Sequence, residues 1–330
     1  MKKTYAFSEI KDKLLFDGRV LMREDGAILG WEGSGFEFRG EFEGEISIGA
    51  ECSSPFYYDK TYWLGLYYVV DGEPHKTGRI FNETQSLTVA NVEKGFHTIK
   101  VIKSSQSIFN SIKIKSITFD GKIGEKPEEK KLAVEFIGDS ITAGSVVMSY
   151  ESDPPDLEID TSSDSYWFYP GVACRLLDAK MYDVSTGGVG LVNREGGFGT
   201  NADSYYEFTD YYHDREEKWD FEKNRSDVVV IALGTNDGAY HEKQDEYIEI
   251  ARKFLRKVRK NNPGAYIFWI YGMMFRNFEG LFKRLIDEEN DGRMKYIPMP
   301  TDNRGGYDHP GKAAHIEYGR IIAEEIKKIL

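Results

Sequence analysis

Cysteine is scarce in this chain of 330 residues, which contains two, Cys52 and Cys174. They lie far apart and carry no metal-ligand spacing, so we expect free, buried thiols and no cysteine-based metal site. Positive charge is also in deficit, because 43 Lys and Arg stand against 55 Asp and Glu, for a net charge of −12. An acidic chain with no basic stripe argues against nucleic acid, anionic membranes and polyanionic substrates as partners.

Long apolar runs are missing too. No window approaches the length of a membrane span, and the first eleven residues carry positive charge but no apolar core of a signal peptide. We therefore expect a protein that does not enter a membrane and that is cytoplasmic as the sequence stands, or secreted if a signal has been lost. His75, His97, His213 and His241 lie in unrelated segments without ligand spacing, so no metal and no cofactor are expected.

The first part of the chain has the pattern of β-structure. Residues 35–44 alternate aromatic and polar side chains with period two, and residues 62–70 are rich in aromatic and β-branched types before the turn signal Asp71-Gly72. Further strands are expected at 86–90, 96–102 and 112–119. Turn residues recur at short intervals, so we predict an all-β jelly-roll sandwich, a domain of the carbohydrate-binding type, over residues 1–122.

The pattern changes after a charged stretch with Gly and Pro, whose residues 123–131 we interpret as the linker. Residues 132–330 alternate strands and helices, which predicts an α/β domain: a three-layer α/β/α, flavodoxin-like fold with a parallel five-stranded sheet. The predicted strands are 132–137, 181–184, 228–233, 266–271 and 294–298. The predicted helices are 165–179, 242–260, 276–289 and 310–330.

Four segments that could carry chemistry follow strands of this predicted sheet: Gly138-Asp139-Ser140, then residues 185–190, 233–237 and 307–310. Parallel strands place their carboxyl ends at one edge, so these segments can meet in space. Acyl transfer through serine needs a nucleophile, a base and donors for the developing oxyanion. Ser140 supplies the hydroxyl and His309 the base. The backbone amides of Ser140 and Gly188 and the side-chain amide of Asn236 supply the oxyanion hole.

Each segment also has a plainer interpretation. Asp139 or Ser140 could cap a helix, the glycines near 188 could be ordinary turn residues, and Asn236-Asp237-Gly238 is a good turn sequence. His309 precedes a proline and could be a surface residue. These interpretations are reasonable singly, but together the four segments follow successive strands in the order that a serine esterase requires.

The four segments carry a family resemblance. Residues 132–330 resemble the SGNH hydrolases, also called GDSL esterases: Gly138-Asp139-Ser140 matches the serine block, Gly188 the glycine block, residues 234–237 the asparagine block and His309-Pro310 the histidine block. The resemblance implies Ser140 and His309 as catalytic residues. It also implies Ser140, Gly188 and Asn236 as the oxyanion hole.

The chain departs from the family at one position. The wider family often has an aspartate three residues before the histidine, where this chain has Gly306. Related esterases manage without that acid, so we expect a Ser–His pair. Its histidine would be oriented by a backbone carbonyl or by another group, with Asp302 and Asp308 as weaker candidates. For Asp308 a capping or turn role before Pro310 is favoured.

A narrower resemblance extends over nearly the whole chain. A β-domain followed by a hydrolase is similar to the family-two carbohydrate esterases, of which acetylxylan esterases are members, and residues 70–72, 97–101 and 219–221 are supporting segments. It implies removal of O-acetyl groups from plant-type oligo- or polysaccharides, the expected partners. A lipase-like or acyl-thioesterase hydrolase and an inactive carbohydrate-binding protein remain alternatives. The ring-rich stretch 192–226 would either stack against sugar or pack the two domains together.

Overall fold

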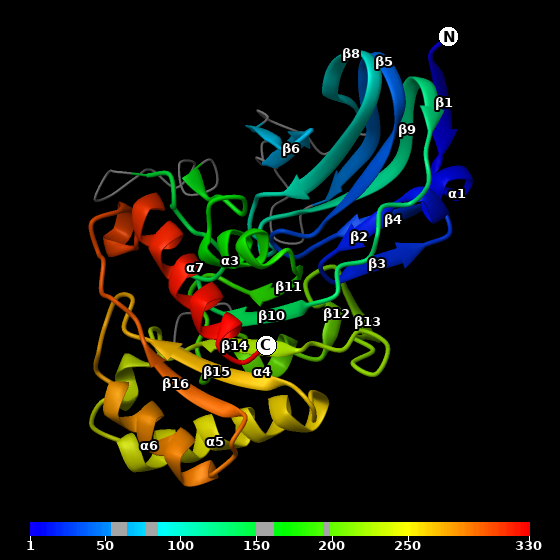
Figure 1. Ribbon diagram of the computed structural model, residues 1–330. Helices are drawn as coiled ribbons and strands as arrows, with labels where there is room; N and C mark the ends of the chain where they lie inside the picture. Colours follow the sequence, from blue (N-terminus) through cyan, green and yellow to red (C-terminus); the bar gives the residue numbers. More distant parts are fainter. Residues whose placement is uncertain (54–64, 77–84, 150–161, 194–198) are drawn as a thin grey trace. The chain divides into compact units, whose positions relative to one another are not determined.

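The computed structural model describes residues 1–53, 65–76, 85–149, 162–193 and 199–330. The chain divides into two compact units. The first contains residues 1–129 together with 209–217, and the second contains 130–208 together with 218–330. Figure 1 shows the order of the elements along the chain.

The first unit is built from antiparallel strands. Two of them are very long, β5 (Gly35–Ser53) and β8 (Gln85–Lys103), and β9 (Ser111–Ile123) pairs with the other side of β5. The other elements are β1 (Lys3–Ala6), α1 (Phe7–Ile10), a 3₁₀ helix (Lys11–Lys13), β2 (Leu15–Asp17), β3 (Val20–Arg23), β4 (Gly26–Leu29), β6 (Leu66–Val70) and β7 (Glu73–Lys76). Within the described ranges they form one sheet with the order β3-β4-β9-β5-β8-β6-β7, while β1 pairs with β9 and β2 with β5.

The long strands change one expectation. Residues 86–90 and 96–102 were predicted as two strands, but both belong to β8. The pairing of β8 with β5 shifts register between Phe42 and Gly44, and Gly44 takes a left-handed φ of 73°. A bulge of this kind lets a strand bend and continue through residues that otherwise signal a turn. Residues 62–64 of the predicted strand 62–70 lie outside the described residues.

The core of the first unit consists of the inward side chains of these strands. Phe36, Phe38 and Phe42 alternate along β5 and are fully buried, and the ring of Phe42 meets that of Phe119 edge-on at 5.0 Å. Successive side chains of a strand point to opposite faces of the sheet. The aromatic residues of the predicted period-two pattern therefore lie on the face that forms the core. Cys52 and Cys174, the latter in the second unit, are both buried and neither forms a disulfide bond, which confirms the prediction of buried thiols outside a disulfide.

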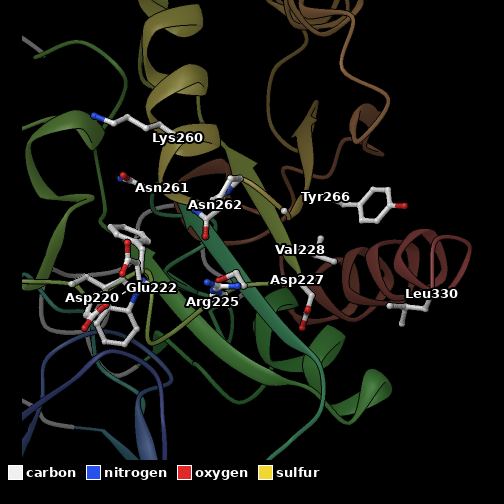
Figure 2. Close-up of a pocket in the computed structure, with 15 residues that line it drawn as sticks. Asp220, Glu222, Arg225, Asp227, Val228, Lys260, Asn261, Asn262, Tyr266 and Leu330 are labelled. Atoms are coloured by element: carbon white, nitrogen blue, oxygen red, sulfur yellow. Dashed lines mark hydrogen bonds between the residues drawn. The ribbon is translucent and has the colours of Figure 1, made fainter.

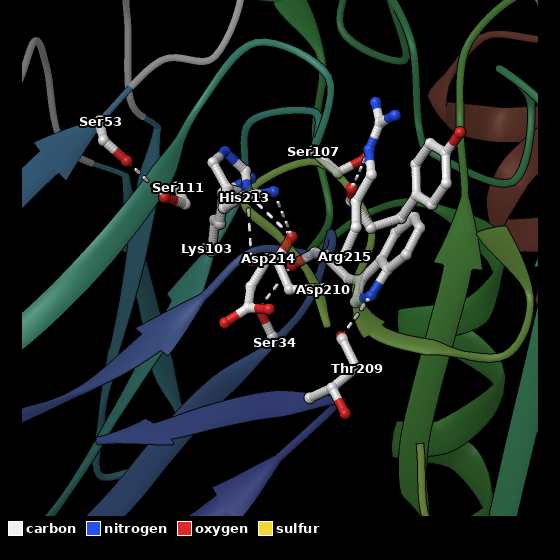
Figure 3. A network of polar contacts seen from close by, with 12 residues as sticks. Ser34, Ser53, Lys103, Ser107, Ser111, Thr209, Asp210, His213, Asp214 and Arg215 are labelled. Atoms are coloured by element: carbon white, nitrogen blue, oxygen red, sulfur yellow. Dashed lines mark hydrogen bonds and ion pairs between the residues drawn. The ribbon is translucent and has the colours of Figure 1, made fainter. Parts of the chain in front are cut away.

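A hairpin from the second half of the sequence belongs to the first unit. It consists of β12 (Phe208–Asp210) and β13 (Asp214–Lys218), and its residues 209–217 pack within that unit. The indole of Trp31 donates to the carbonyl of Thr209 over 2.8 Å, and the Asp210 carboxylate accepts from the ring of His213 over 2.8 Å. Figure 3 shows this buried polar network. The chain therefore passes from the second unit to the first and back again around this hairpin.

The second unit has a parallel sheet in the order β11-β10-β14-β15-β16 among the described residues. Its strands are β10 (Ala133–Gly138), β11 (Lys180–Ser185), β14 (Val228–Ala232), β15 (Tyr266–Tyr271) and β16 (Met294–Pro298). The helices are α3 (Tyr169–Leu177), α4 (Ala202–Tyr205), α5 (Gln244–Asn261), α6 (Glu279–Glu289) and α7 (Lys312–Lys327), with 3₁₀ turns at Gly238–Tyr240 and Gly306–Asp308. The five predicted strands and the four predicted helices are confirmed; the strands 266–271 and 294–298 match at both ends, and the other elements are slightly shifted at one or both ends.

Helices cover both faces of this sheet, as Figure 1 shows. On one face α3 and α7 pack against each other and against the sheet, with Phe136 and Tyr169 in a single buried cluster. On the other face α5 and α6 cover the sheet, where the ring of Trp269 stacks on Phe282 at 4.6 Å. A parallel sheet buried on both faces accounts for the continuous apolar runs of its strands. No helix within the described ranges is long and apolar enough to cross a membrane.

Candidate active site

Ser140 lies directly after the carboxyl end of β10, the second strand in the sheet order. The strand is buried along almost its whole length, and Gly138 ends it where a Cβ atom would come within 1.8 Å of Thr142 Oγ1. A glycine is therefore needed for the sharp exit of the chain from the sheet. Turns follow, in which Ala143 N donates to Asp139 O and Ser145 N to Ser140 O, both over 2.9 Å. The chain thus holds Ser140 on a rigid turn, with 9% of the residue's surface exposed.

Asp139, beside the serine, is an organiser of this turn. Its carboxylate accepts the backbone amide of Ile141 over 3.0 Å, and the side chain is fully enclosed. Burial raises the pKa of Asp139 to about 7, because a charged carboxylate loses its hydration there. The residue thus contacts the backbone of the turn that carries Ser140.

His309 reaches Ser140 from the far end of the chain. It follows the 3₁₀ turn at residues 306–308 and precedes α7, and its Nε2 atom lies 2.8 Å from Ser140 Oγ. Its Nδ1 atom lies 2.9 Å from the carbonyl oxygen of Tyr307. The structure therefore brings together the two residues predicted as nucleophile and base.

The contact with Tyr307 fixes the tautomer of the imidazole. A carbonyl oxygen can only accept, so Nδ1 must carry the proton and donate it to Tyr307, which leaves Nε2 free to accept from the Ser140 hydroxyl. Burial lowers the pKa of His309 below its ordinary value of 6.5. The ring is consequently neutral at pH 7 and has the lone pair of a general base aimed at the serine.

A strained backbone holds this arrangement. Tyr307 and Asp308 both take left-handed φ angles, of 51° and 57°, which are unfavourable for residues with a side chain. The turn is closed by hydrogen bonds from His309 N to Gly306 O over 3.0 Å and from Gly305 N to His309 O over 2.9 Å. Both bonds help to direct the carbonyl of Tyr307 toward the ring of His309.

The two carboxylates considered as partners of His309 are placed elsewhere. Asp302 forms an ion pair with Arg304, whose Nε donates over 3.0 Å, and it also accepts the backbone amide of Arg304. Asp308 is exposed, and within the described residues no hydrogen bond joins it to His309. The position three residues before the histidine is Gly306, which is buried. A backbone carbonyl therefore orients His309, one of the possibilities that the sequence left open.

The predicted oxyanion donors follow the strands on either side of β10. Gly138 pairs with Ser185 of β11 and with Ala232 of β14, so the segments after these two strands flank the serine turn. Gly188 takes a left-handed φ of 74°. The Asn236 side chain donates one of its amide hydrogens to the carbonyl of Val189 over 3.0 Å, which places it beside the residue after Gly188.

The donor groups themselves are free to act. Within the described residues, no hydrogen bond is formed by the backbone amide of Ser140 or Gly188, and the Asn236 amide has a second hydrogen beyond the one given to Val189. Unpaired amides of this kind, at one edge of a sheet, can bind the negatively charged oxygen of a tetrahedral intermediate. The roles of these residues stay predictions.

The ring-rich stretch 192–226 turns out to be largely core. Tyr205 is fully buried and donates to Gly138 O over 2.9 Å, Tyr206 is fully buried and donates to Glu135 over 3.3 Å, and the ring of Trp219 meets Tyr182. Tyr205 and Tyr206 therefore support β10, the strand that precedes Ser140, and Trp219 packs on β11. Phe198 lies outside the described residues.

Two features of the site were not predicted. A backbone carbonyl was among the expected partners of His309, but no signal in the sequence indicated that it would be that of Tyr307, because every residue offers a carbonyl. Asp237, which follows Asn236, accepts backbone amides from the glycine-block segment, and its adjacency to Asn236 was the one available hint.

A large cavity of about 760 Å³ lies elsewhere in the second unit. It is lined by the amino ends of β14 and β15, through Asp227, Val228 and Tyr266, and by the end of α5 at Asn262, as Figure 2 shows. These strand ends face the edge opposite to Ser140, so the cavity has no part in the Ser–His chemistry. Among the described residues, no group of His, Cys, Asp or Glu could hold a metal ion.

A serine and a neutral histidine at the carboxyl edge of a doubly wound parallel sheet define a site of the serine-hydrolase class. The chain belongs to the GDSL-like Lipase/Acylhydrolase family, whose sequence pattern matches residues 136–326. This confirms the predicted resemblance to GDSL esterases.

Known proteins extend the likeness to the whole chain. The Cellulase/esterase CelE of Acetivibrio thermocellus is 26% identical over 96% of this chain, which spans 39% of that protein. The Acetylxylan esterase / glucomannan deacetylase of Cellvibrio japonicus is 22% identical over 81% of this chain and 76% of its own length. A solved structure of a family two carbohydrate esterase from Clostridium thermocellum, in complex with cellohexaose, is 22% identical and superposes with a TM-score of 0.85 over 96% of this chain and 98% of that one. The superposition confirms the predicted fold.

Proposed function

We propose that this protein is a serine esterase that removes O-acetyl groups from plant-type oligo- or polysaccharides. The observation that carries the proposal is the hydrogen bond of 2.8 Å between Ser140 Oγ and His309 Nε2, with the ring held by a carbonyl on its other side. A serine so placed has its proton acceptor already aligned, which is the requirement for nucleophilic catalysis by a hydroxyl group.

Acylation would proceed by attack of Ser140 Oγ on the carbonyl carbon of a sugar acetate, while the hydroxyl proton moves to His309 Nε2. The carbonyl oxygen becomes an oxyanion that the amides of Ser140, Gly188 and Asn236 bind. Collapse of the intermediate breaks the bond between carbon and sugar oxygen. His309 gives its proton to that oxygen, so a free sugar hydroxyl leaves and acetyl-Ser140 remains.

Deacylation repeats the sequence with water. Neutral His309 takes a proton from a water molecule, the hydroxide attacks the acetyl carbon, and the same donors bind the second oxyanion. The ester bond to Ser140 then breaks, Ser140 Oγ regains the proton from His309, and acetate leaves. The Tyr307 carbonyl keeps the same ring nitrogen protonated throughout, so the imidazolium formed in each half-reaction retains a partner.

The substrate class rests on the family and on the proteins that the chain resembles. Membership of an acylhydrolase family supports ester hydrolysis, and the two curated relatives are named an esterase and an acetylxylan esterase. A match to a carbohydrate esterase over the whole chain, β-unit included, favours sugar acetates over the long acyl chains of a lipase or the thioesters of a thioesterase. The Ser140–His309 pair disfavours a protein that only binds carbohydrate.

The proposal is tested by release of acetate from acetylated xylo- and gluco-oligosaccharides, beside nitrophenyl esters of increasing chain length. We expect acetate release that depends on Ser140, turnover of the acetyl ester, and a steep fall for longer acyl chains. The Ser140→Ala variant, with an unchanged melting temperature, should lose several orders of magnitude in rate. A preference for long acyl chains would assign the protein to the lipases. If the wild type hydrolysed no ester, the remaining alternative would be an inactive protein that binds carbohydrate.

A further inference from the structure

We propose that Asp237 is a positioning residue that ties the segment of Gly188 to the segment of Asn236 and so sets the geometry of the oxyanion hole. The inference rests on the proposed esterase function. Gly188 and Asn236 lie on different loops, after β11 and after β14. Two donors on separate loops can bind one oxyanion only if the loops are fixed relative to each other.

The carboxylate of Asp237 makes the connection. Its Oδ2 accepts the backbone amide of Leu191 over 3.0 Å, and its Oδ1 accepts that of Val192 over 3.1 Å. A third donor, the hydroxyl of Tyr247 from α5, reaches Oδ2 over 2.7 Å. The loop after β14, the loop after β11 and a helix of the outer layer therefore meet at one buried side chain, which is 3% exposed.

The neighbouring residues show that the approach is close. Gly190 lies against this carboxylate, and a Cβ atom at that position would come within 2.2 Å of Asp237 Oδ1. A glycine is therefore required for the loop to reach the carboxylate. The connection is also made in the other direction, since the Asn236 side chain donates to Val189 O over 3.0 Å.

These contacts enclose Gly188 within a short span. A hydrogen bond of 3.4 Å from Val189 N to Thr186 O spans Gly188, and the amides of Leu191 and Val192 are held three and four residues after Gly188. A segment held on both sides has little freedom to turn its amide away. Asp237 is also the residue directly after Asn236 in the chain, so a shift of Asp237 would displace both donors together.

The chemistry of the side chain suits this task. An ionised carboxylate is an acceptor at both oxygens, and all three of its partners are donors, so it satisfies two backbone amides and one hydroxyl at once. Asparagine has the same shape, but its amide nitrogen is a donor and would face a backbone N–H. Asp237→Asn therefore disrupts the connection with little change in volume.

The test compares Asp237→Asn with Asp227→Asn. Asp227 precedes the same strand, β14, and accepts the backbone amide of Ala133 over 2.8 Å, far from the serine edge. With acetyl esters, Asp237→Asn should lower kcat about 10- to 100-fold and change KM less than about threefold, because the oxyanion forms only in the transition state. Asp227→Asn should keep the kcat of the wild type.

A double-mutant cycle separates positioning from general destabilisation. If Asp237 acts through the oxyanion donors, its substitution must cost much less in an Asn236→Ala background than in the wild type. Equal losses in both backgrounds, or a kcat for Asp237→Asn equal to that of the wild type, would overturn the inference. If Asp237→Asn does not fold, Tyr247→Phe removes one of the three donors and should lower kcat several-fold with the same dependence on Asn236. An unchanged kcat in that variant would also overturn it.

The same experiment distinguishes a failure of this inference from a failure of the proposed function. Wild type and Ser140→Ala are assayed alongside on the same ester. If the wild type shows no hydrolysis that depends on Ser140, the proposed function fails. If that dependence holds while the Asp237 variants behave like the wild type, the positioning role alone is wrong.

Discussion

Replacement of Asp308 by asparagine tests whether a backbone carbonyl is enough to orient His309, the proposed general base. Asp308 is exposed and has no hydrogen bond to His309 within the described residues, so its carboxylate acts on the ring only through its charge. Two unit charges about 4 Å apart in water interact by about 1 kcal/mol. We therefore expect Asp308→Asn to lower kcat/KM by less than about fivefold.

His309→Ala provides the scale for that loss. Without the ring, Ser140 has no proton acceptor, and the rate should fall by about 10⁴-fold or more. Both variants are assayed on an acetyl ester with the melting temperature as the control for folding. A loss near 10⁴-fold in Asp308→Asn would show that Asp308 is an essential third member and would refute the assignment to the Tyr307 carbonyl.

The pH profile gives the same prediction a second readout. His309 acts as a base only when neutral, so activity falls as the pH drops through its pKa, which burial places below 6.5. The negative charge of Asp308 raises that pKa, since it favours the imidazolium. Asp308→Asn should consequently move the acid limb of the kcat/KM profile to lower pH. A shift to higher pH would contradict the electrostatic argument.

Three further predictions concern other parts of the chain. Asn236→Ala should lower kcat about 10²- to 10³-fold with little change in KM, and a change confined to KM would make the residue a binding group. His97 has a raised pKa because its ring donates to Asp71, so this pair stabilises the fold below pH 6.5 and loses its effect as the pH rises through the raised pKa. Asp71→Asn should thus lower the free energy of unfolding by less than about 1 kcal/mol near pH 6 and not at all at high pH, measured by urea titration. A fragment of residues 130–330 should be poorly soluble, since its hairpin 209–217 loses the first unit, and a stable, fully active fragment would contradict this.

The sequence predicted the layers of the fold because their signals are local. The apolar strand before Ser140 and the helical spacing of apolar residues in α5 are patterns that a few neighbouring residues create. The four segments of the site could be predicted for a related reason, since a parallel sheet brings the residues after its strands to one edge. Their order along the chain was therefore enough to place Ser140 near His309.

Other features depend on contacts between distant segments. Tyr205 and Tyr206 are aromatic residues of the kind that stack on sugar rings. Both are buried against β10, which follows from packing that the sequence does not reveal. The hairpin 209–217 joins the first unit through the Trp31 indole, a contact that no periodicity predicts. The domain boundaries at 122 and 132 stay a prediction, and the chain crosses between the units again at this hairpin.

The conformation at Tyr307 and Asp308 could not be predicted for a different reason. Tyr307 and Asp308 both have left-handed backbone, a conformation that residues with a side chain rarely adopt. Such conformations are concentrated at functional sites. The strained turn presents the Tyr307 carbonyl to His309, so the residue that departs from local preference is also the one that replaces the missing acid.

The most direct test of the central claim is to locate the acyl-enzyme. The protein is mixed with a nitrophenyl acetate, quenched in acid at the time of the initial burst, and its peptides are mapped by mass spectrometry. We predict one acetyl group on Ser140 in the wild type and none at that position in His309→Ala. An acetyl group on another residue, or the same labelling of Ser140 without His309, would contradict a Ser140 nucleophile activated by His309.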